Sequence, residues 1–571
     1  MTLTAACSKV GDGKDEGAGK GPDAQAFVVD YDGKAVTPAK PVEGAKTGGV
    51  ITILEDGAPE HLDPQQIYVS NALSYGQLVH RSLTGYIETG KAGEPLQLVG
   101  DLATNAGVKS ADAKVWTYTL RDGLKFEDGS PITSKDVAYG IARSFGPQGT
   151  QGPQFLQSAL DEKRGKDGAY PGPGGAAGDL PPGVTTPDDK TIIFTFTTPH
   201  VEIPYLLAFP TSTPVQKSKD TKEKYDNEWQ SSGPYKRAEL VPGVKLTLEK
   251  NPNWDPASDP IRHQYVDKFV FDFTTDAKAQ TDRISAAAGG DAAAVMVDNV
   301  PPDQIPVVKG NADLMKRVAV GPNQYVYYMN INTSRVTDLA VRQALNYAFD
   351  RDAYLKAIGG YDIASPASTI MSPVVPGYKN FDAYPSLPDN HGDVEKAKKL
   401  LEGKTVGKLT FCTSNTPTNQ TVSAVIIESF KRVGLDVTAK FIERSAYYTE
   451  IGRKGIECDL MSSAWGQDYP DGESTLGVLM DGSKIVAEGN NNYSYFAADD
   501  IIAKLKELRE LTDRGAAAAQ YGDLDKLIME KYAPLIPLRY GRNFTIYGPQ
   551  VGNTFLNQFS QFDVLGAYVK S

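Results

Sequence analysis

The chain has 571 residues, which is too many for one hydrophobic core, so three to four domains or subdomains are expected. Its formal net charge is −12 and no block of Lys and Arg occurs, which argues against nucleic-acid binding, because neutralising phosphates requires clustered cations. No run of 18 apolar residues is present, so the sequence predicts no membrane-spanning helix.

The chain starts MTLTAACSK, and its first cysteine, Cys7, ends the segment TAAC. This segment resembles the lipobox of bacterial lipoproteins, in which the cysteine becomes the lipidated first residue. Six residues precede Cys7 without a charged or apolar leader, so we interpret this start as trimmed or placed too late. A chance N-terminal cysteine is the alternative. Residues 8–47 lack hydrophobic periodicity and are expected to form a flexible tether, with order beginning at Gly48.

From Gly48 onward the sequence predicts mixed strands and helices without internal repeats. VWTYTLR, at 115–121, alternates like a half-buried strand. Ser134 is expected to cap the helix that follows, which carries Val137 and further apolar residues on one face. Residues 146–190 are rich in Gly and Pro, which predicts a surface loop between elements.

The second half of the chain predicts a small α/β domain. LTFCTS (409–414) and DVTAKFIE (436–443) are typical of strands, and a helical pattern at 422–434 separates them. DLMSSAW (459–465) follows as another buried strand. This strand–helix–strand order predicts a partly parallel sheet.

Two further cysteines, Cys412 and Cys458, lie in this half. If Cys7 is lipidated, both lie in an oxidising compartment and could pair. The bond would close a loop of about 45 residues and contribute roughly 3–4 kcal/mol. Two free buried thiols are the alternative, and the sequence leaves both open.

Motifs of common enzyme classes are missing. The sequence contains no G-x-S-x-G, H-E-x-x-H or G-x-x-x-x-G-K-[ST] segment. A glycosidase-type pair of carboxylates is spatial and stays open. The five histidines stand singly without the spacing of metal ligands: His61, His80, His200, His263 and His391. We therefore expect no metal, no cofactor and no catalysis.

Five segments together resemble a known family. They are DLATNAGVKSADAKVWTYTLRDGLKFEDGSPITSKDVAYGIARSF, SGPYKRAEL with LTLEKNPNW, NINTSRVTDLAVRQALNYAFDR, AWGQDYPDG and APLIPLRY. In this order they are similar to the solute-binding proteins of ABC importers, extracytoplasmic family 5, a group that includes oligopeptide- and dipeptide-binding proteins. The resemblance covers nearly everything from Gly48 to the C-terminus.

The resemblance implies an α/β, two-lobed periplasmic-binding-protein-like fold of type II, cluster C-like, with a hinge that lets the lobes close over a ligand. The chain would cross between the lobes twice, and lobe I would carry an extra subdomain. The implied parts are the N-terminus and tether (1–47), lobe I (48–79, 211–320 and 548–571), the extra subdomain (80–210) and lobe II (321–547).

The segment W-x-x-D-Y implies the ligand site. In oligopeptide-binding members its aspartate pairs with the α-ammonium of the peptide, and here that residue is Asp468. Ala464 and Gly466 would let a strand pair with the ligand main chain, and Trp465 would form an apolar wall. Alternatively, Asp468 caps the turn that follows and Trp465 belongs to the core.

Tyr469 completes the same segment. Further candidates for the cleft lie near the lobe crossings, Tyr327, Tyr328, Arg539 and Tyr540, and in an early loop, His61. For each of the four at the crossings, an ordinary place in a sheet is an equally good interpretation, since tyrosine suits strands.

We therefore expect a monomeric extracytoplasmic receptor, not an enzyme, on the outer face of the cell membrane through lipidated Cys7 alone. It would capture an oligopeptide-like ligand by hinge closure and present it to the permease of an ABC importer. One alternative keeps the fold but binds an oligosaccharide or another small solute. A second alternative is a secreted hydrolase or signalling receptor on the same scaffold.

Overall fold

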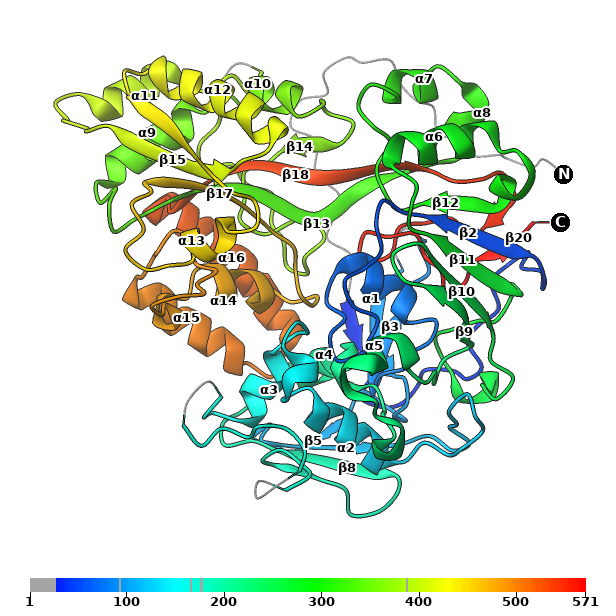
Figure 1. The fold of residues 1–571 in the computed structure, drawn as a ribbon. Coiled ribbons are helices and arrows are strands. Elements are labelled where there is room, and N and C mark those ends of the chain that lie inside the picture. Colours follow the sequence, from blue (N-terminus) through cyan, green and yellow to red (C-terminus); the bar gives the residue numbers. More distant parts are fainter. Residues whose placement is uncertain (1–26, 92–93, 165–166, 175–177, 387–388, 571) are drawn as a thin grey trace, which may run out of the picture.

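The computed structural model describes residues 27–91, 94–164, 167–174, 178–386 and 389–570. Figure 1 shows two masses of mixed helices and strands that are joined at the top by two long strands. None of the helices in the described part of the chain combines the length and the hydropathy needed to cross a bilayer.

The right-hand mass in Figure 1 is built on a five-stranded sheet. Strand β2 lies between β11 and β12 and runs parallel to both, while β10 is antiparallel to its neighbours. In sheet order the strands are β12 (Ala294–Met296), β2 (Val50–Leu54), β11 (Lys268–Asp272), β10 (Lys245–Lys250) and β9 (Tyr235–Val241). Ile51, Trp116 and Phe271 belong to one buried cluster, here called the first core.

A four-stranded sheet lies at the bottom of the same mass (Figure 1). Its strands are β5 (Val108–Lys109), β6 (Val115–Thr119), β8 (Thr191–Thr195) and β7 (Val184–Thr185), and the helices beside it are α2 (Ser134–Arg143), α3 (Phe155–Leu160) and α4 (Ile203–Leu206). The prediction that 146–190 is only a surface loop is wrong, because this stretch contains α3 and β7 and buries Leu156.

The cap of α2 also differs from the prediction. Thr133, not Ser134, is the N-cap residue, and the carboxylate of Asp136 accepts hydrogen bonds from the Thr133 backbone N–H and Oγ1. Ser134 instead donates its hydroxyl to the carbonyl of Asp188. A carboxylate three residues into the helix that reaches back to the N-cap residue satisfies donors that would otherwise lack partners.

The chain is ordered earlier than the sequence predicts. Strand β1 (Phe27–Val29) runs parallel to β4 (Leu96–Gly100), which pairs with β3 (Thr84–Ile87) on its other side. The expectation of a flexible tether is therefore wrong for residues 27–47. Cys7 and the rest of the expected tether lie outside the described residues.

The left-hand mass contains a six-stranded mixed sheet (Figure 1). β15 is parallel to β16 and β17, as predicted, and β13 is antiparallel to β17 and β18. In sheet order the strands are β14 (Ala364–Pro366), β18 (Leu535–Ile546), β13 (Val318–Ile331), β17 (Leu460–Trp465), β15 (Leu409–Ser414) and β16 (Val437–Ile442). Cys412 on β15 and Cys458 before β17 form a disulfide, with their Cα atoms 5.8 Å apart.

Helices cover both faces of this sheet. Above it in Figure 1 lie α9 (Leu339–Ala348), α10 (Arg351–Ala357), α11 (Val394–Leu401) and α12 (Pro417–Lys431), and below it lie α14 (Glu473–Leu479), α15 (Asp499–Glu510) and α16 (Arg514–Tyr532). Their apolar faces and the sheet form a separate buried cluster, here called the second core, which includes Tyr328, Leu345 and Leu505.

Strands β13 and β18 connect the two masses. They pair from Val318 with Ile546 at one end to Asn330 with Leu535 at the other. Ile546 packs in a small cluster with Leu54 of β2, whereas the far end lies in the second core. The register shifts twice between these ends, so the ladder is irregular where the strands pass from one mass to the other.

The remaining elements are short. They are α1 (Ser70–Gly76), α5 (Tyr225–Glu228), α6 (Ala277–Ala286), α7 (Ile305–Lys309), α8 (Ala312–Met315), α13 (Tyr447–Ile451), β19 (Val551–Gly552) and β20 (Tyr568–Val569). The C-terminal stretch packs back on the right-hand mass, because Val551 and Val564 belong to the first core.

Candidate functional site

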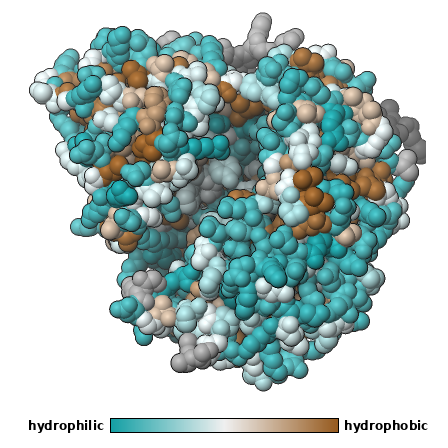
Figure 2. Space-filling model, in the orientation of Figure 1, coloured by the Kyte–Doolittle hydropathy of each residue, from teal (hydrophilic) through white to brown (hydrophobic). Residues whose placement is uncertain are grey.

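The loop that follows β17 lies where the two masses meet. Figure 2 shows the molecular surface hollowed between the mass at upper left and the mass at right and below. Asp468, in this loop, contacts Tyr68, which precedes α1 in the right-hand mass. The loop therefore connects the two sides directly.

Asp468 is the most unusual group of this boundary. Tyr68 donates its hydroxyl to Oδ1 of Asp468 at 2.5 Å. The other oxygen, Oδ2, is buried and meets no hydrogen-bond partner among the described residues. Burial raises the pKa of Asp468 to about 7, and the Tyr68 hydrogen bond only partly opposes this. Buried acceptors are normally satisfied, so an orphaned carboxylate oxygen indicates a position that a donor from outside the chain can fill.

A second set of polar contacts joins the masses nearby. The hydroxyls of Ser70 and Tyr325 lie 3.2 Å apart, and the Gln324 side-chain amide donates to Ser70 Oγ at 3.1 Å. Gln324 also donates its backbone N–H to the hydroxyl of Ser560. The start of α1, the middle of β13 and the C-terminal stretch therefore converge beside Asp468.

Gly466 makes room for these contacts. A Cβ atom at this position would lie 2.9 Å from the Gln324 side chain and 3.0 Å from the Tyr325 ring. From the sequence we expected this glycine to make room for the main chain of a ligand. In the structure it makes room for the side chains of Gln324 and Tyr325. Ala464 lies opposite Tyr327 in the β13–β17 register and is half-buried.

Arg539 and Tyr327 are direct cross-strand partners on β18 and β13. The guanidinium lies 3.4 Å from the centre of the Tyr327 ring, a close cation–π contact. Nε of Arg539 is buried without a hydrogen-bond partner among the described residues. This pair is thus another place where the site offers an unsatisfied donor.

Three of the predicted cleft residues are held in the second core. The indole N–H of Trp465 donates to the carbonyl of Ser474 at 2.9 Å. Tyr540 is 7% exposed, and its hydroxyl accepts the backbone N–H of Thr369. Tyr328 is fully buried. These contacts favour structural roles for the three side chains, because their polar atoms are already used within the protein.

Tyr469 packs on the opposite mass. It is 7% exposed and belongs to the first core, although Trp465 before it packs against the second core and Leu476 after it belongs to the second core. Its ring stacks on Tyr205 with centroids 5.4 Å apart and meets Phe155 edge-on at 6.1 Å. Tyr469 therefore inserts from one mass into an aromatic pocket of the other.

His61 is also occupied. Its Nδ1 lies 3.1 Å from the carboxylate of Asp226, which also accepts the backbone N–H groups of Leu62 and Asp63. The arrangement fastens the early loop to α5, and it does not direct His61 toward Asp468.

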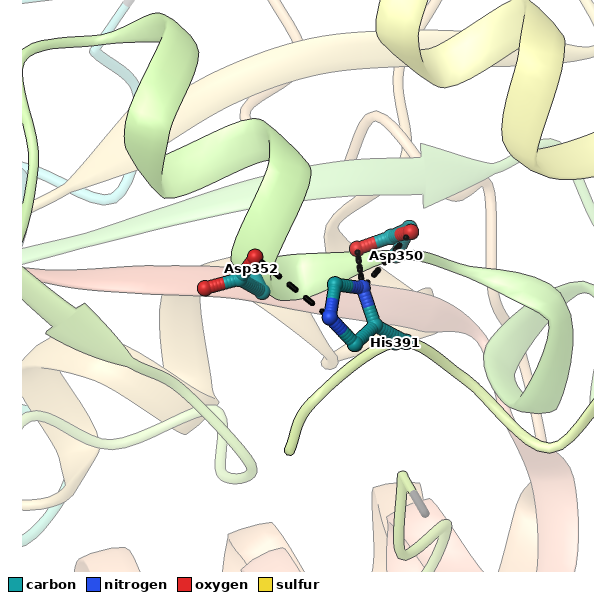
Figure 3. Close-up of side chains that lie close together, drawn as sticks. All are labelled: Asp350, Asp352 and His391. Carbon is teal, nitrogen blue, oxygen red and sulfur yellow. Dashed lines mark hydrogen bonds and ion pairs between the residues drawn. The ribbon is translucent and has the colours of Figure 1, made fainter. Parts of the chain in front are cut away.

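His391 lies close to two carboxylates, although the sequence shows no metal-ligand spacing around it. Figure 3 shows its ring between Asp350 and Asp352, with Nδ1 3.1 Å from the first and Nε2 3.6 Å from the second. Each carboxylate already has another cation, since Arg432 lies 3.3 Å from Asp350 and Lys356 lies 2.8 Å from Asp352. The group is therefore better described as an ion-pair network than as a set of free metal ligands.

Sequence reasoning missed Tyr68, Ser70, Gln324 and Tyr325. None of them stands in a recognisable motif, and Tyr68 lies 400 residues from the aspartate that it contacts. A tyrosine just ahead of a helix has many ordinary roles. Only the three-dimensional arrangement brings these residues to the segment that the sequence did single out.

The sequence is also similar to known proteins. The family described as bacterial extracellular solute-binding proteins, family 5 Middle, matches residues 97–485. The periplasmic oligopeptide-binding protein OppA of Salmonella typhimurium is 26% identical over 464 residues, which are 78% of this chain and 80% of the relative. The oligopeptide-binding protein OppA of Bacillus subtilis is 23% identical over 487 residues, 81% and 83% of the two chains.

A solved structure extends the similarity over almost the whole chain. The clavulanic acid biosynthesis oligopeptide binding protein 2 superposes with a TM-score of 0.85 at 27% identity, and the match covers 96% of this chain and 99% of that chain. The expected two-lobed α/β fold is confirmed. Because the family match also spans more than half of the sequence, this chain belongs to family 5 of the bacterial extracellular solute-binding proteins.

Proposed function

We propose that this protein is the extracytoplasmic receptor of an ABC importer, which captures oligopeptides between two closing lobes and delivers them to a membrane permease. The observation that carries the proposal is the buried, unpaired Oδ2 of Asp468 at the boundary between the masses. A peptide N-terminus is an ammonium with three donors, which suits this acceptor. The named relatives are oligopeptide-binding proteins, which supports the same ligand class.

Strand β17 supports an extended ligand. β15 pairs with β17 only at Leu460 and Met461, whereas the pairing of β13 with β17 continues to Trp465. Along its last residues β17 therefore has one edge without a strand partner in the described part of the chain. An extended peptide can add to such an edge through main-chain hydrogen bonds, which give affinity without reading side chains. Asp468 follows this edge directly and would bind the end of the added strand.

Hinge closure follows from the proposed lobes. We assign 48–79, 211–320 and 548–571 to lobe I, 80–210 to its subdomain and 321–547 to lobe II. The separation of the first core from the second core supports the division between lobe I, together with its subdomain, and lobe II. A ligand that contacts both lobes favours the closed state, because only that state makes both sets of contacts.

We further propose that lipidated Cys7 anchors a monomeric receptor to the outer face of the cell membrane. The TAAC segment supports this. Cys7→Ser is expected to move the protein from the membrane fraction to the soluble extracytoplasmic fraction. Retention of the variant in the membrane fraction would contradict the anchor.

Calorimetric titration tests the ligand class. We expect heat from a mixture of tri- to hexapeptides, much less from the same mixture after N-acetylation, and none from an oligosaccharide pool. Recovered peptides should be intact by mass spectrometry, as for a receptor without turnover. Binding of the sugars alone would leave the family membership in place and remove the peptide proposal. The comparisons do not favour the oligosaccharide alternative.

Peptide affinity should depend on pH through Asp468. Its pKa of about 7 in the ligand-free protein means that, below pH 7, a proton must leave before the carboxylate can pair with an ammonium. Affinity is therefore expected to fall about tenfold per pH unit below 7. Above pH about 8 the peptide amine itself loses its proton, so affinity should be greatest near pH 7.5. Titrations from pH 5.5 to 9 measure this profile, and a flat acidic side would contradict the role of Asp468.

A further inference from the structure

A large cavity lies away from the boundary between the masses. Its volume is about 1110 Å³, and it is enclosed by the N-terminal segment 28–43, the β3–β4 hairpin and the C-terminal segment 553–566. Small-molecule sites typically occupy about 300–1,000 Å³, so this cavity is large enough for a small organic ligand. Asp468 and the other residues of the proposed peptide site do not line it.

Glu88 places a carboxylate in this cavity without an ion-pair partner among the described residues. It follows β3 and lines the cavity, and its Oε2 accepts the backbone N–H of Gln558 at 2.7 Å. Burial raises its pKa to about 8, and the nearby carboxylate of Asp563 adds to this. Among the described residues, no Lys, Arg or His forms an ion pair with it. A carboxylate that is charged here without a counter-ion lowers the stability of the folded protein. Binding of a cation from solution beside it is therefore favourable.

Three lysines line the cavity, Lys34, Lys40 and Lys91. Lys34 pairs with Asp32 at 2.7 Å, and Lys91 pairs with Glu94 at 4.0 Å. All three lysines are exposed, so water screens their charges and they do not neutralise the interior.

The walls are suited to an organic cation. Tyr31, Tyr86, Phe555 and Phe559 line the cavity together with aliphatic residues such as Ile261. Aromatic rings attract ammonium groups through their negative faces and also cover apolar carbon. The interior thus combines the Glu88 carboxylate, which has no ion-pair partner among the described residues, with aromatic and aliphatic walls.

We propose that this cavity is a second ligand site, which takes a small organic ammonium ion with an apolar body and uses Glu88 as its counter-ion. The site is separate from the proposed peptide site and stands without it. The chain segments that form it belong to the right-hand mass, so it does not need the two masses to close.

The test compares an amine with its neutral isostere. In the Asp468→Asn background, which removes the carboxylate of the boundary site, 2-phenylethylamine should bind by calorimetry and should bind more tightly than 2-phenylethanol. Adding Glu88→Gln should weaken the amine at least about tenfold, as expected for loss of a buried charge partner, and leave the alcohol unchanged. Glu43→Gln, at an exposed carboxylate of the same rim, is the matched control and should change neither.

Two results would overturn the proposal: equal amine affinity with and without Glu88→Gln, or loss of all amine binding in Asp468→Asn alone. Crystals of the wild-type protein soaked with 4-bromophenylethylamine give an answer that needs no variant. An anomalous bromine peak is expected within the cavity, and a peak only beside Asp468 would refute the second site. Peptide binding by Glu88→Gln should equal that of wild type, so failure of this site and failure of the peptide site are distinguishable.

Discussion

Asp468→Asn is expected to weaken the binding of peptides with a free N-terminus by about 30-fold or more, corresponding to roughly 2–5 kcal/mol. The variant keeps the size of the side chain and can still accept the hydroxyl of Tyr68, but it removes the charge that would pair with the ammonium. Calorimetry at pH 7.5 measures the difference. N-acetylated peptides have no ammonium, so their weak binding should be the same in both proteins.

The same variant should be more stable than wild type, although it binds peptides more weakly. This difference distinguishes the loss of a ligand contact from misfolding. The pKa of Asp468 is about 7 in the folded protein and near 3.8 when unfolded, so the folded state holds the proton more tightly. The cost of the charge is absent below pH 3.8, grows through pH 7 and is fully present at pH 8. Asp468→Asn is therefore expected to raise the free energy of unfolding at pH 8 by roughly 1–3 kcal/mol, after allowance for partial exposure.

A matched control is Glu457→Gln, at an exposed carboxylate just before β17. It makes the same change of net charge in the same region without touching the boundary. Its peptide affinity and its unfolding free energy should stay within about 0.5 kcal/mol of wild type. If Asp468→Asn binds free peptides as tightly as this control does, Asp468 is not the amine anchor.

The sequence located Asp468 because its neighbours form a compact segment, W-x-x-D-Y, followed by a turn. It could not locate Tyr68, whose contact with Asp468 spans 400 residues. It also could not separate the two faces of β17 and β18. Trp465 and Tyr540 use their polar atoms within the protein, whereas Arg539 stacks on Tyr327 and its Nε has no hydrogen-bond partner among the described residues. Alternation along a strand says that faces differ but does not say which one meets a ligand.

Order in the N-terminal segment was missed for a similar reason. β1 has only three residues within a run rich in Gly, Asp and Lys, and its partner β4 lies about seventy residues away. Its strand exists because β4 offers a free edge, which local composition does not report. The same holds for the cavity around Glu88, which needs the N-terminal and C-terminal segments to meet. His391 likewise reaches Asp350 only through the fold.

The position of Tyr469 lets its side chain test the contribution of lobe closure to peptide binding. It follows Asp468 directly but does not face the same way, since its ring is buried between Tyr205 and Phe155 of the opposite mass. In an open receptor this ring would be exposed to water. The closed state therefore gains the burial of one aromatic side chain, which contributes about 1.5–3 kcal/mol.

Tyr469→Ala is expected to weaken peptide binding by roughly 10–150-fold, because the ligand must then close the lobes without this contribution. Tyr469→Phe keeps the stacked ring and should bind within a few-fold of wild type. Small-angle scattering with saturating peptide should give a larger radius of gyration for Tyr469→Ala than for Tyr469→Phe, since more of its molecules stay open. A loss of affinity with unchanged closure would mean that Tyr469 contacts the peptide itself. Unchanged affinity would mean that the aromatic pocket does not contribute to closure.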